Sequence, residues 1–118
     1  MANRVMHFEF IAKDPKRLRD FYTGLFGWKP QEIPGMNYTM LHPGDDGING
    51  AIGAHGDGLP AGMTIYVQVD RVEQHLADAQ RRGATVVQSP YDVPGVGRLA
   101  VFADPEGNRV GLWKVTEA

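Results

Sequence analysis

Two side chains near the start of the chain have the types and the spacing for proton-transfer chemistry. His7 and Glu9 are two residues apart in the apolar segment 4–12. Because alternate side chains of a strand point to the same face, both are expected on one face of a sheet. A buried glutamate beside a histidine would serve as a general acid/base pair. A hydrogen-bonded polar pair without catalysis, or a pairing of Glu9 with Arg98 or Arg109, is the simpler interpretation.

Aromatic and small residues form a second set of candidates, suited to binding an organic ligand. Trp113 is in phase with Gly111 on the last expected strand, so the two should share a face. A glycine flanked by a large ring indicates a wall for a ligand, although most such rings end up in a core. Core positions are expected for Phe21, Tyr22 and Phe26. The aromatic residues expected on or beside strands that form a cleft are Trp28, Tyr38, Tyr91, Phe102 and Trp113.

Two helices are predicted to follow the strands that carry these residues. Asp14 has the type of an N-cap, Pro15 suits the first helical position and Gly27 suits the C-terminal end. Asp70 and Gly83 are predicted to bound a second helix with the same separation. Strands are therefore expected immediately before each aspartate and after each glycine.

The two halves of the chain share one register. An offset of 56 residues superposes Asp14 on Asp70, and each half has the order β-α-β-β-β. The alternative is a coincidence of two unrelated strand–helix pairs. A repeat of this kind predicts two matching modules, about 4–56 and about 62–116, within a single domain of 118 residues.

The composition excludes several classes of protein. A formal net charge of −2 leaves no basic footprint for nucleic acid, and no polybasic run indicates a membrane surface. The absence of cysteine excludes disulfides, thiolate nucleophiles and cysteine-bound zinc. The first ten residues lack the apolar core of a signal peptide, and no segment approaches the ~18 apolar residues of a membrane span. A cytoplasmic location is therefore expected.

Several short motifs of the two halves occur together in one known group of proteins. The first half contains His7-Phe8-Glu9-Phe10, Asp14, Phe21-Tyr22 and Phe26-Gly27-Trp28. The second half contains Val67, Asp70, Gly83, the segment Gly97 to Phe102 and Asp104-Pro105-Glu106-Gly107-Asn108. Over nearly the whole chain, these motifs resemble the two modules of the vicinal oxygen chelate superfamily, which includes glyoxalase I, bleomycin-resistance proteins and extradiol dioxygenases.

The resemblance implies a fold and a kind of chemistry. The fold is α+β, with duplicated βαβββ modules forming a curved mixed sheet around a cleft and the helices on the outside. The chemistry depends on a divalent metal that side chains of both modules hold in the cleft, where it chelates vicinal oxygens of the substrate and acts as a Lewis acid. By the same analogy, a homodimer is expected.

The ligand positions that the resemblance implies mostly lack donors in this chain. His7 matches the first position, but the position seven residues before Asp70 is Met63, a poor ligand for a divalent metal. The glutamate position on the last strand is Gly111, and the fourth position falls in the segment 48–55, where no ligand is obvious. A catalytic site needs about three protein ligands, so no metal or other cofactor is expected.

The leading hypothesis is a glyoxalase/bleomycin-resistance-like protein that binds a small, partly apolar or aromatic organic ligand without the metal-dependent chemistry. One alternative is a lyase, isomerase or dioxygenase with a displaced metal site, where His42 or His55 joins His7. Others are a metal-free acid/base enzyme using His7 and Glu9, and a dimeric scaffold without a ligand. The cleft is expected to contain His7, Glu9, Trp28, Tyr38, Met63, Tyr91, Phe102, Gly111 and Trp113.

Overall fold

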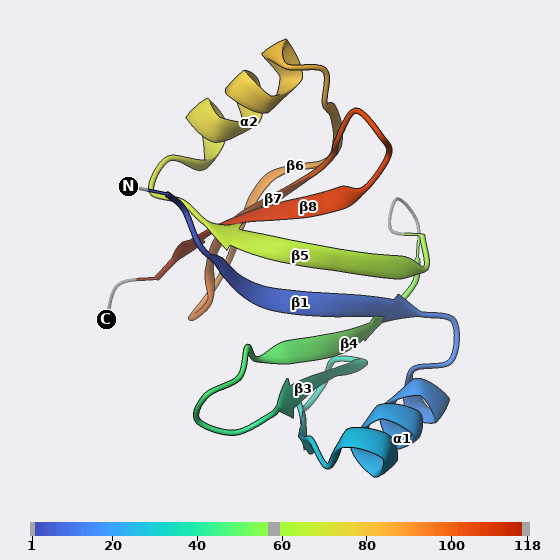
Figure 1. Cartoon of the computed structure of the whole chain (residues 1–118). Helices are drawn as coiled ribbons and strands as arrows, with labels where there is room; N and C mark the ends of the chain where they lie inside the picture. Colours follow the sequence, from blue (N-terminus) through green and yellow to red (C-terminus); the bar gives the residue numbers. More distant parts are fainter. Residues whose placement is uncertain (1, 57–59, 117–118) are drawn as a thin grey trace. The chain divides into compact units, whose positions relative to one another are not determined.

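The structure, a computed structural model, describes residues 2–56 and 60–116. The chain divides into two compact units, which we describe separately (Figure 1). The first unit is His7–Met63, and the second unit combines Met1–Met6 with Thr64–Ala118. Each unit combines a helix with a mixed four-stranded sheet, which confirms the predicted α+β class. Among the described residues, no helix is long and apolar enough to cross a membrane.

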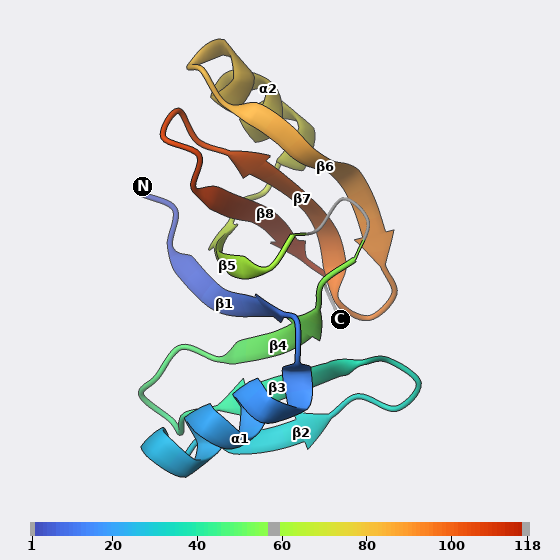
Figure 2. The same cartoon turned by 90° about the vertical axis from the view of Figure 1, so that its right-hand side faces the viewer.

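The first unit contains one helix and four strands. Its elements in chain order are β1 (Val5–Ala12), α1 (Pro15–Phe26), β2 (Lys29–Glu32), β3 (Tyr38–His42) and β4 (Gly50–Ala54), with the first two residues of β1 assigned to the second unit. The strands lie in the order β2-β3-β4-β1, and β4 runs parallel to β1 and antiparallel to β3. Figure 2 shows α1 against one face of this sheet.

Helix α1 begins and ends where the sequence predicts. The carboxylate of Asp14 accepts a hydrogen bond from the Arg17 backbone N–H at 3.2 Å, and Pro15 occupies the first helical position. Gly27 ends the helix with φ of 71°, a left-handed conformation that glycine adopts without steric cost, and its N–H bonds to the Thr23 carbonyl.

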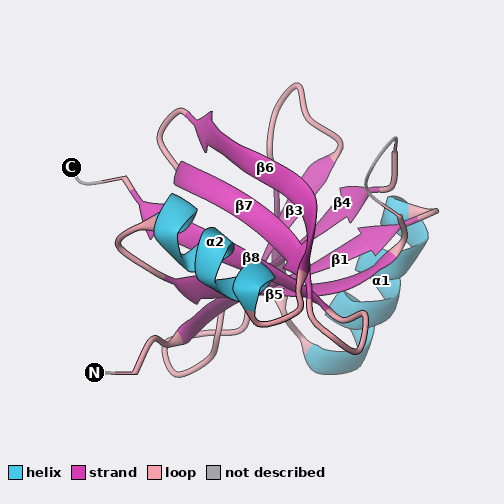
Figure 3. Cartoon of the chain, turned by 90° about the horizontal axis from the view of Figure 1, so that it is seen from above, coloured by secondary structure: helices cyan, strands magenta, loops and turns pink. Residues whose placement is uncertain are grey.

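The second unit repeats the same order of elements. They are β5 (Gly62–Gln68), α2 (Val72–Arg81), β6 (Thr85–Val93), β7 (Gly97–Ala103) and β8 (Arg109–Val115), with the first two residues of β5 assigned to the first unit. The strands lie in the order β5-β8-β7-β6, and β5 runs parallel to β8. Helix α2 packs on β6, β7 and β8 (Figure 3). The repeated β-α-β-β-β order predicted from the sequence is confirmed.

Helix α2 begins one residue later than predicted. Its N-cap is Arg71 rather than Asp70, and no side chain makes the capping hydrogen bond. From the N-cap Asp14 to the N-cap Arg71 the offset is 57 residues, not the 56 expected from the sequence. Because side chains alternate between the faces of a strand, this shift of one residue changes which positions of β1 and β5 match.

Each sheet packs a hydrophobic cluster against its helix. In the first unit this cluster consists of Ala12, Leu41 and Ile52 with Phe8, Phe10, Leu18 and Trp28. In the second unit it consists of Val69, Val72, Leu76, Ala100 and Leu112 with Val67, Val86 and Phe102. We call the opposite face of each sheet its helix-distal face.

The core positions predicted for Phe21 and Phe26 are wrong, since their side chains are 57% and 56% exposed on α1.

Candidate functional site

Strand β1 divides its side chains between the two faces of the first sheet. Phe8 and Phe10 belong to the cluster beneath α1. Alternation therefore directs His7, Glu9 and Ile11 to the helix-distal face. All three are buried: His7 is 5% exposed and Glu9 is 8% exposed. The structure thus places the two residues with proton-transfer chemistry on one face, in a setting with little water.

The carboxylate of Glu9 is held by a tyrosine from another strand. The Tyr38 hydroxyl on β3 donates a hydrogen bond of 2.5 Å to Oε2 of Glu9. Strand β4 lies between β1 and β3, with Ala51 opposite Glu9 and Gly53 opposite Tyr38. A side chain at Gly53 would meet the tyrosine ring, because a Cβ there would lie 3.1 Å from Cδ1 of Tyr38. The small residues on β4 therefore leave the space through which Tyr38 reaches Glu9.

Burial also sets the charge of His7. Removal of water from the imidazole lowers the pKa of His7 from 6.5 to about 4. The ring is therefore neutral near pH 7, with one nitrogen as a donor and the other as an acceptor. We call His7, Glu9 and Tyr38 the polar triplet. It combines a neutral imidazole, a carboxyl group and a phenol on one face of one sheet.

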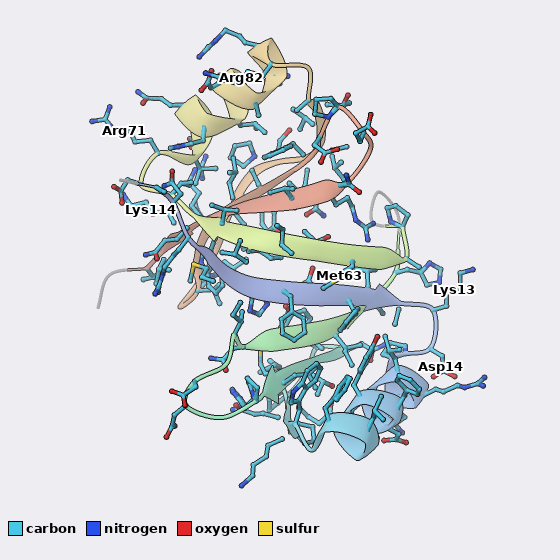
Figure 4. All side chains as sticks on the ribbon, in the orientation of Figure 1. Lys13, Asp14, Met63, Arg71, Arg82 and Lys114 are labelled. Atoms are coloured by element: carbon cyan, nitrogen blue, oxygen red, sulfur yellow. The ribbon has the colours of Figure 1, made fainter. Side chains whose placement is uncertain are left out.

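In the second unit, the structural offset of 57 changes the residue that matches His7. That residue is Thr64, which is buried at 2% exposure on β5. Met63 precedes it in the strand, so its side chain points to the opposite face, and it is 51% exposed (Figure 4). Thr64 therefore replaces Met63 as the match of His7, and a contact of Met63 with a ligand stays a prediction. The earlier match rested on Asp70, which resembles an N-cap but stands one residue before it.

The glutamate position that the resemblance implies is closed by an aromatic ring. Gly111 on β8 lies opposite Tyr66 on β5. A Cβ added at Gly111 would overlap the ring of Tyr66. A larger residue at this position is thus incompatible with the observed place of Tyr66.

The donors of the described residues do not fit the metal that the resemblance implies. Of the matching positions, Thr64 offers a neutral hydroxyl and Gly111 offers no side chain. Within residues 2–56 and 60–116, no group of three or more histidine, cysteine, aspartate or glutamate side chains could hold a metal ion. No step of the chemistry is therefore assigned to a metal.

The helix-distal face of the second sheet is lined by apolar side chains. Tyr66, Leu99 and Val101 form a buried cluster there, with Trp113 packed against it. The rings of Tyr66 and Trp113 meet edge to face, with centroids 6.2 Å apart, and Trp113 Nε1 donates a 3.0 Å hydrogen bond to the Val96 carbonyl. Sequence reasoning missed Tyr66. Tyr66 lies 57 residues after Glu9, so with the corrected offset it is the residue of the second unit that matches Glu9. With the offset of 56 this match is not found.

Three other predicted cleft residues have different surroundings. Trp28 packs against Phe8 at 5.5 Å and Phe26 at 5.0 Å, on the side of the first sheet that faces α1. Phe102 packs against the cluster beneath α2. Both rings thus lie on the side of their sheet that faces the helix, which ring size and strand position do not reveal, and their contact with a ligand stays a prediction. Tyr91 lies on the edge strand β6 opposite Leu99, is 38% exposed and donates a weak 3.4 Å hydrogen bond to Gln88.

A repeated βαβββ unit, with one helix on one face of each sheet, defines the class of fold. The chain belongs to the glyoxalase/bleomycin resistance protein/dioxygenase superfamily, whose family description matches residues 4–112. The resemblance drawn from the motifs is thereby confirmed.

Proteins that are similar to this chain have diverse names. The anthracycline biosynthesis protein DnrV of Streptomyces peucetius is 31% identical over an alignment of 124 positions, gaps included, which covers 91% of this chain and 45% of that protein. The chain thus spans less than half the length of this curated relative. A variant of homoprotocatechuate 2,3-dioxygenase from B. fuscum has a TM-score of 0.70 at 19% identity, covering 97% of this chain and 32% of that chain. A superfamily member from Vibrio splendidus has a TM-score of 0.65 at 16% identity, covering 96% and 99%.

Proposed function

We propose that this protein binds a small aromatic organic molecule that carries hydroxyl groups, and that the polar triplet recognises those hydroxyls. The single observation that carries the proposal is the 2.5 Å hydrogen bond between Tyr38 and Glu9, on the same face as a neutral His7. A carboxylate accepts hydrogen bonds from hydroxyl groups, whereas a neutral imidazole both donates and accepts.

Apolar neighbours on the same face support an aromatic ligand. Ile11 follows Glu9 on this face of β1. Met40 on β3 is paired with Ala51 on β4, which in turn is paired with Glu9, so Met40 lies on the same face. A few placed polar groups among apolar side chains are typical of sites for small organic molecules. The name of the relative DnrV suggests an anthracycline as a first probe. Simple catechols and phenols are the second group of probes.

The test is calorimetric titration of the protein with an anthracycline and with catechols. Tyr38→Phe removes the hydroxyl that holds Glu9, and we expect it to weaken binding about 5- to 15-fold, in line with about 1–1.5 kcal/mol for one hydrogen bond. Tyr22→Phe is the matched control, since it removes the same group from a tyrosine of α1. The ring of Tyr22 stacks on Phe10, which belongs to the cluster beneath the helix. Equal affinity of the wild type and Tyr38→Phe, or no binding of any probe, would contradict the proposal.

A second candidate function is metal-free acid/base catalysis. It is favoured by the placement of the His7 imidazole on the same buried face of β1 as the carboxyl group of Glu9. On this proposal, His7→Ala would reduce turnover of a bound substrate by at least about 100-fold. A pure binding protein would lose affinity only modestly with the same change. Product formation from each bound probe, followed by chromatography, distinguishes the two functions.

A further inference from the structure

The helix-distal face of the first sheet continues beyond the polar triplet to its outer edge. Strand β2 forms that edge, because the strands lie in the order β2-β3-β4-β1 (Figure 2). Lys29 on β2 is paired with His42 on β3, and Gln31 is paired with Met40. Since Met40 lies on the helix-distal face, alternation along both strands places Lys29, Gln31 and His42 on the same face.

Side-chain contacts agree with this assignment of faces. Glu32, the residue after Gln31, pairs with Arg19 on α1 at 2.6 Å, so the Glu32 side chain points toward the helix. The neighbouring Gln31 side chain therefore points away from the helix. Its Oε1 lies 2.9 Å from Nε2 of His42, a contact that requires both side chains to be on one face.

The hydrogen bond to His42 orients the amide group of Gln31. An amide oxygen only accepts hydrogen bonds, so the His42 nitrogen donates and the Gln31 oxygen accepts. The amide nitrogen of Gln31 then presents its two hydrogens as donors. Two positions away on the same strand, Lys29 adds an ammonium group, which also only donates. Two neighbouring exposed side chains thus offer donors at the edge of this face.

Lys29 also supplies a positive charge at this edge. Among the described residues it forms no ion pair. The acidic residue of its own strand, Glu32, lies on the other face and is paired with Arg19. On the helix-distal face of β1 to β4, the acidic side chain is Glu9, and strands about 4.8 Å apart put β1 roughly 14 Å from β2. An anion is therefore attracted to the edge and repelled at the inner end of the face.

Burial decreases across this face from β1 to β2. His7 and Glu9 are 5% and 8% exposed, Met40 is partly exposed, and Lys29 and Gln31 are exposed. A hydroxyl group can be buried at small cost if it is hydrogen-bonded, whereas burial of a carboxylate costs far more. A ligand that spans the face is thus expected to place a hydroxyl at the polar triplet and an ionised acid at the edge.

We propose that Lys29 and Gln31 form a carboxylate subsite at the β2 edge, with His42 as the residue that positions Gln31. This inference rests on the proposed function and defines its ligand more closely. The ligand is an elongated aromatic acid with its hydroxyl and carboxyl groups at opposite ends. A frame of two or more fused rings suits strands that lie roughly 14 Å apart better than a single ring does.

Calorimetric titration with two matched probes tests the subsite. One probe is a hydroxynaphthoic acid with the hydroxyl and carboxyl groups at opposite ends of its two fused rings, and the other is the uncharged methyl ester of this acid. The wild type should bind the acid more tightly than the ester, and added salt should reduce this preference. Lys29→Met should weaken binding of the acid roughly 3- to 10-fold, as for a partly exposed charge pair, and binding of the ester less than about 2-fold.

Two further variants serve as controls for Lys29→Met. Lys16→Met removes the same charge from an exposed position of α1, on the other side of the sheet, and should leave both affinities unchanged. Lys29→Arg keeps the charge and should keep the preference for the acid.

His42→Leu tests the positioning role. It should weaken binding of the acid but not of the ester, because only the orientation of the Gln31 amide is lost. Equal weakening for both probes would contradict this role. Circular dichroism of each variant shows whether it is folded.

The outcomes separate the subsite from the proposed function on which it rests. If Lys29→Met binds the acid as tightly as the wild type, while Tyr38→Phe weakens binding of both probes, the subsite is overturned and the proposed function stands. If the wild type binds neither probe, both are contradicted.

Discussion

At the scale of residues, the important features are close approaches that only small side chains permit. Gly53 leaves room for the ring of Tyr38, which reaches across β4 to bond Glu9. In the second unit, Gly111 leaves room for the ring of Tyr66. A glycine that leaves room for a tyrosine ring thus permits a polar contact in one sheet and apolar packing in the other.

The pairing of Gly111 with Tyr66 predicts strong coupling between the two positions. Gly111→Ala should lower the free energy of unfolding by about 1–3 kcal/mol, because the added Cβ overlaps the ring of Tyr66. In a Tyr66→Ala background the ring is absent, so the same substitution should cost much less. Urea denaturation of the four proteins of this double-mutant cycle measures the coupling. Additive effects would show that the ring moves aside at little cost.

At the scale of elements, the two helices match in order but differ in how they begin. α1 has the side-chain cap of Asp14, whereas α2 begins after Arg71 without a capping hydrogen bond. Asp70, which has the right type for a cap, stands one residue too early. The position of a cap depends on where the helical backbone starts, which a residue type alone does not determine.

The different helix starts predict different effects of the same substitution. Asp14→Ala should destabilise the protein by about 1 kcal/mol, because the Arg17 N–H loses its acceptor. Asp70→Ala should change the free energy of unfolding by less than about 0.5 kcal/mol, as for an exposed residue without such a role. Thermal and urea unfolding of the two variants compare them directly. A larger loss for Asp70→Ala would mean that α2 is capped as the sequence suggested.

At the scale of the whole molecule, burial of His7 links folding to pH. The pKa of His7 is about 4 in the folded protein, and its ordinary value of 6.5 applies to the unfolded chain. Between these values the unfolded chain binds a proton that the folded protein does not. Acid therefore lowers the free energy of unfolding through protonation of His7 in the unfolded chain. Well above pH 6.5 neither state binds this proton, and the loss of stability disappears.

This link predicts that His7→Gln reduces the sensitivity of the protein to acid. From pH 7 to pH 4 the wild type should lose up to about 3 kcal/mol through His7, a loss that the variant avoids. The measurement is urea unfolding of both proteins across this pH range. Carboxylates with lowered pKa, such as Asp104 and Glu73, affect both proteins alike, so the difference isolates His7. Parallel pH profiles would contradict the assignment.

The sequence by itself determined the α+β class, the repeated order of elements, both ends of α1 and the common face of His7 and Glu9. These properties depend on short-range patterns: alternation in strands, apolar spacing in helices, and the conformations that Asp14 and Gly27 favour. The motifs also sufficed to identify the superfamily, because together they extend over nearly the whole chain.

Only the tertiary structure decided which side chains meet. Tyr38 and Glu9 are 29 residues apart, and their contact depends on the register of β3, β4 and β1. The sequence likewise did not reveal that Trp28 and Phe102 pack beneath the helices or that Tyr66 covers Gly111. Because the predicted offset between the halves was one residue too small, Met63 rather than Thr64 was matched to His7. The physical reason is that strand register fixes both the face and the neighbour of every side chain, and long-range pairing sets that register.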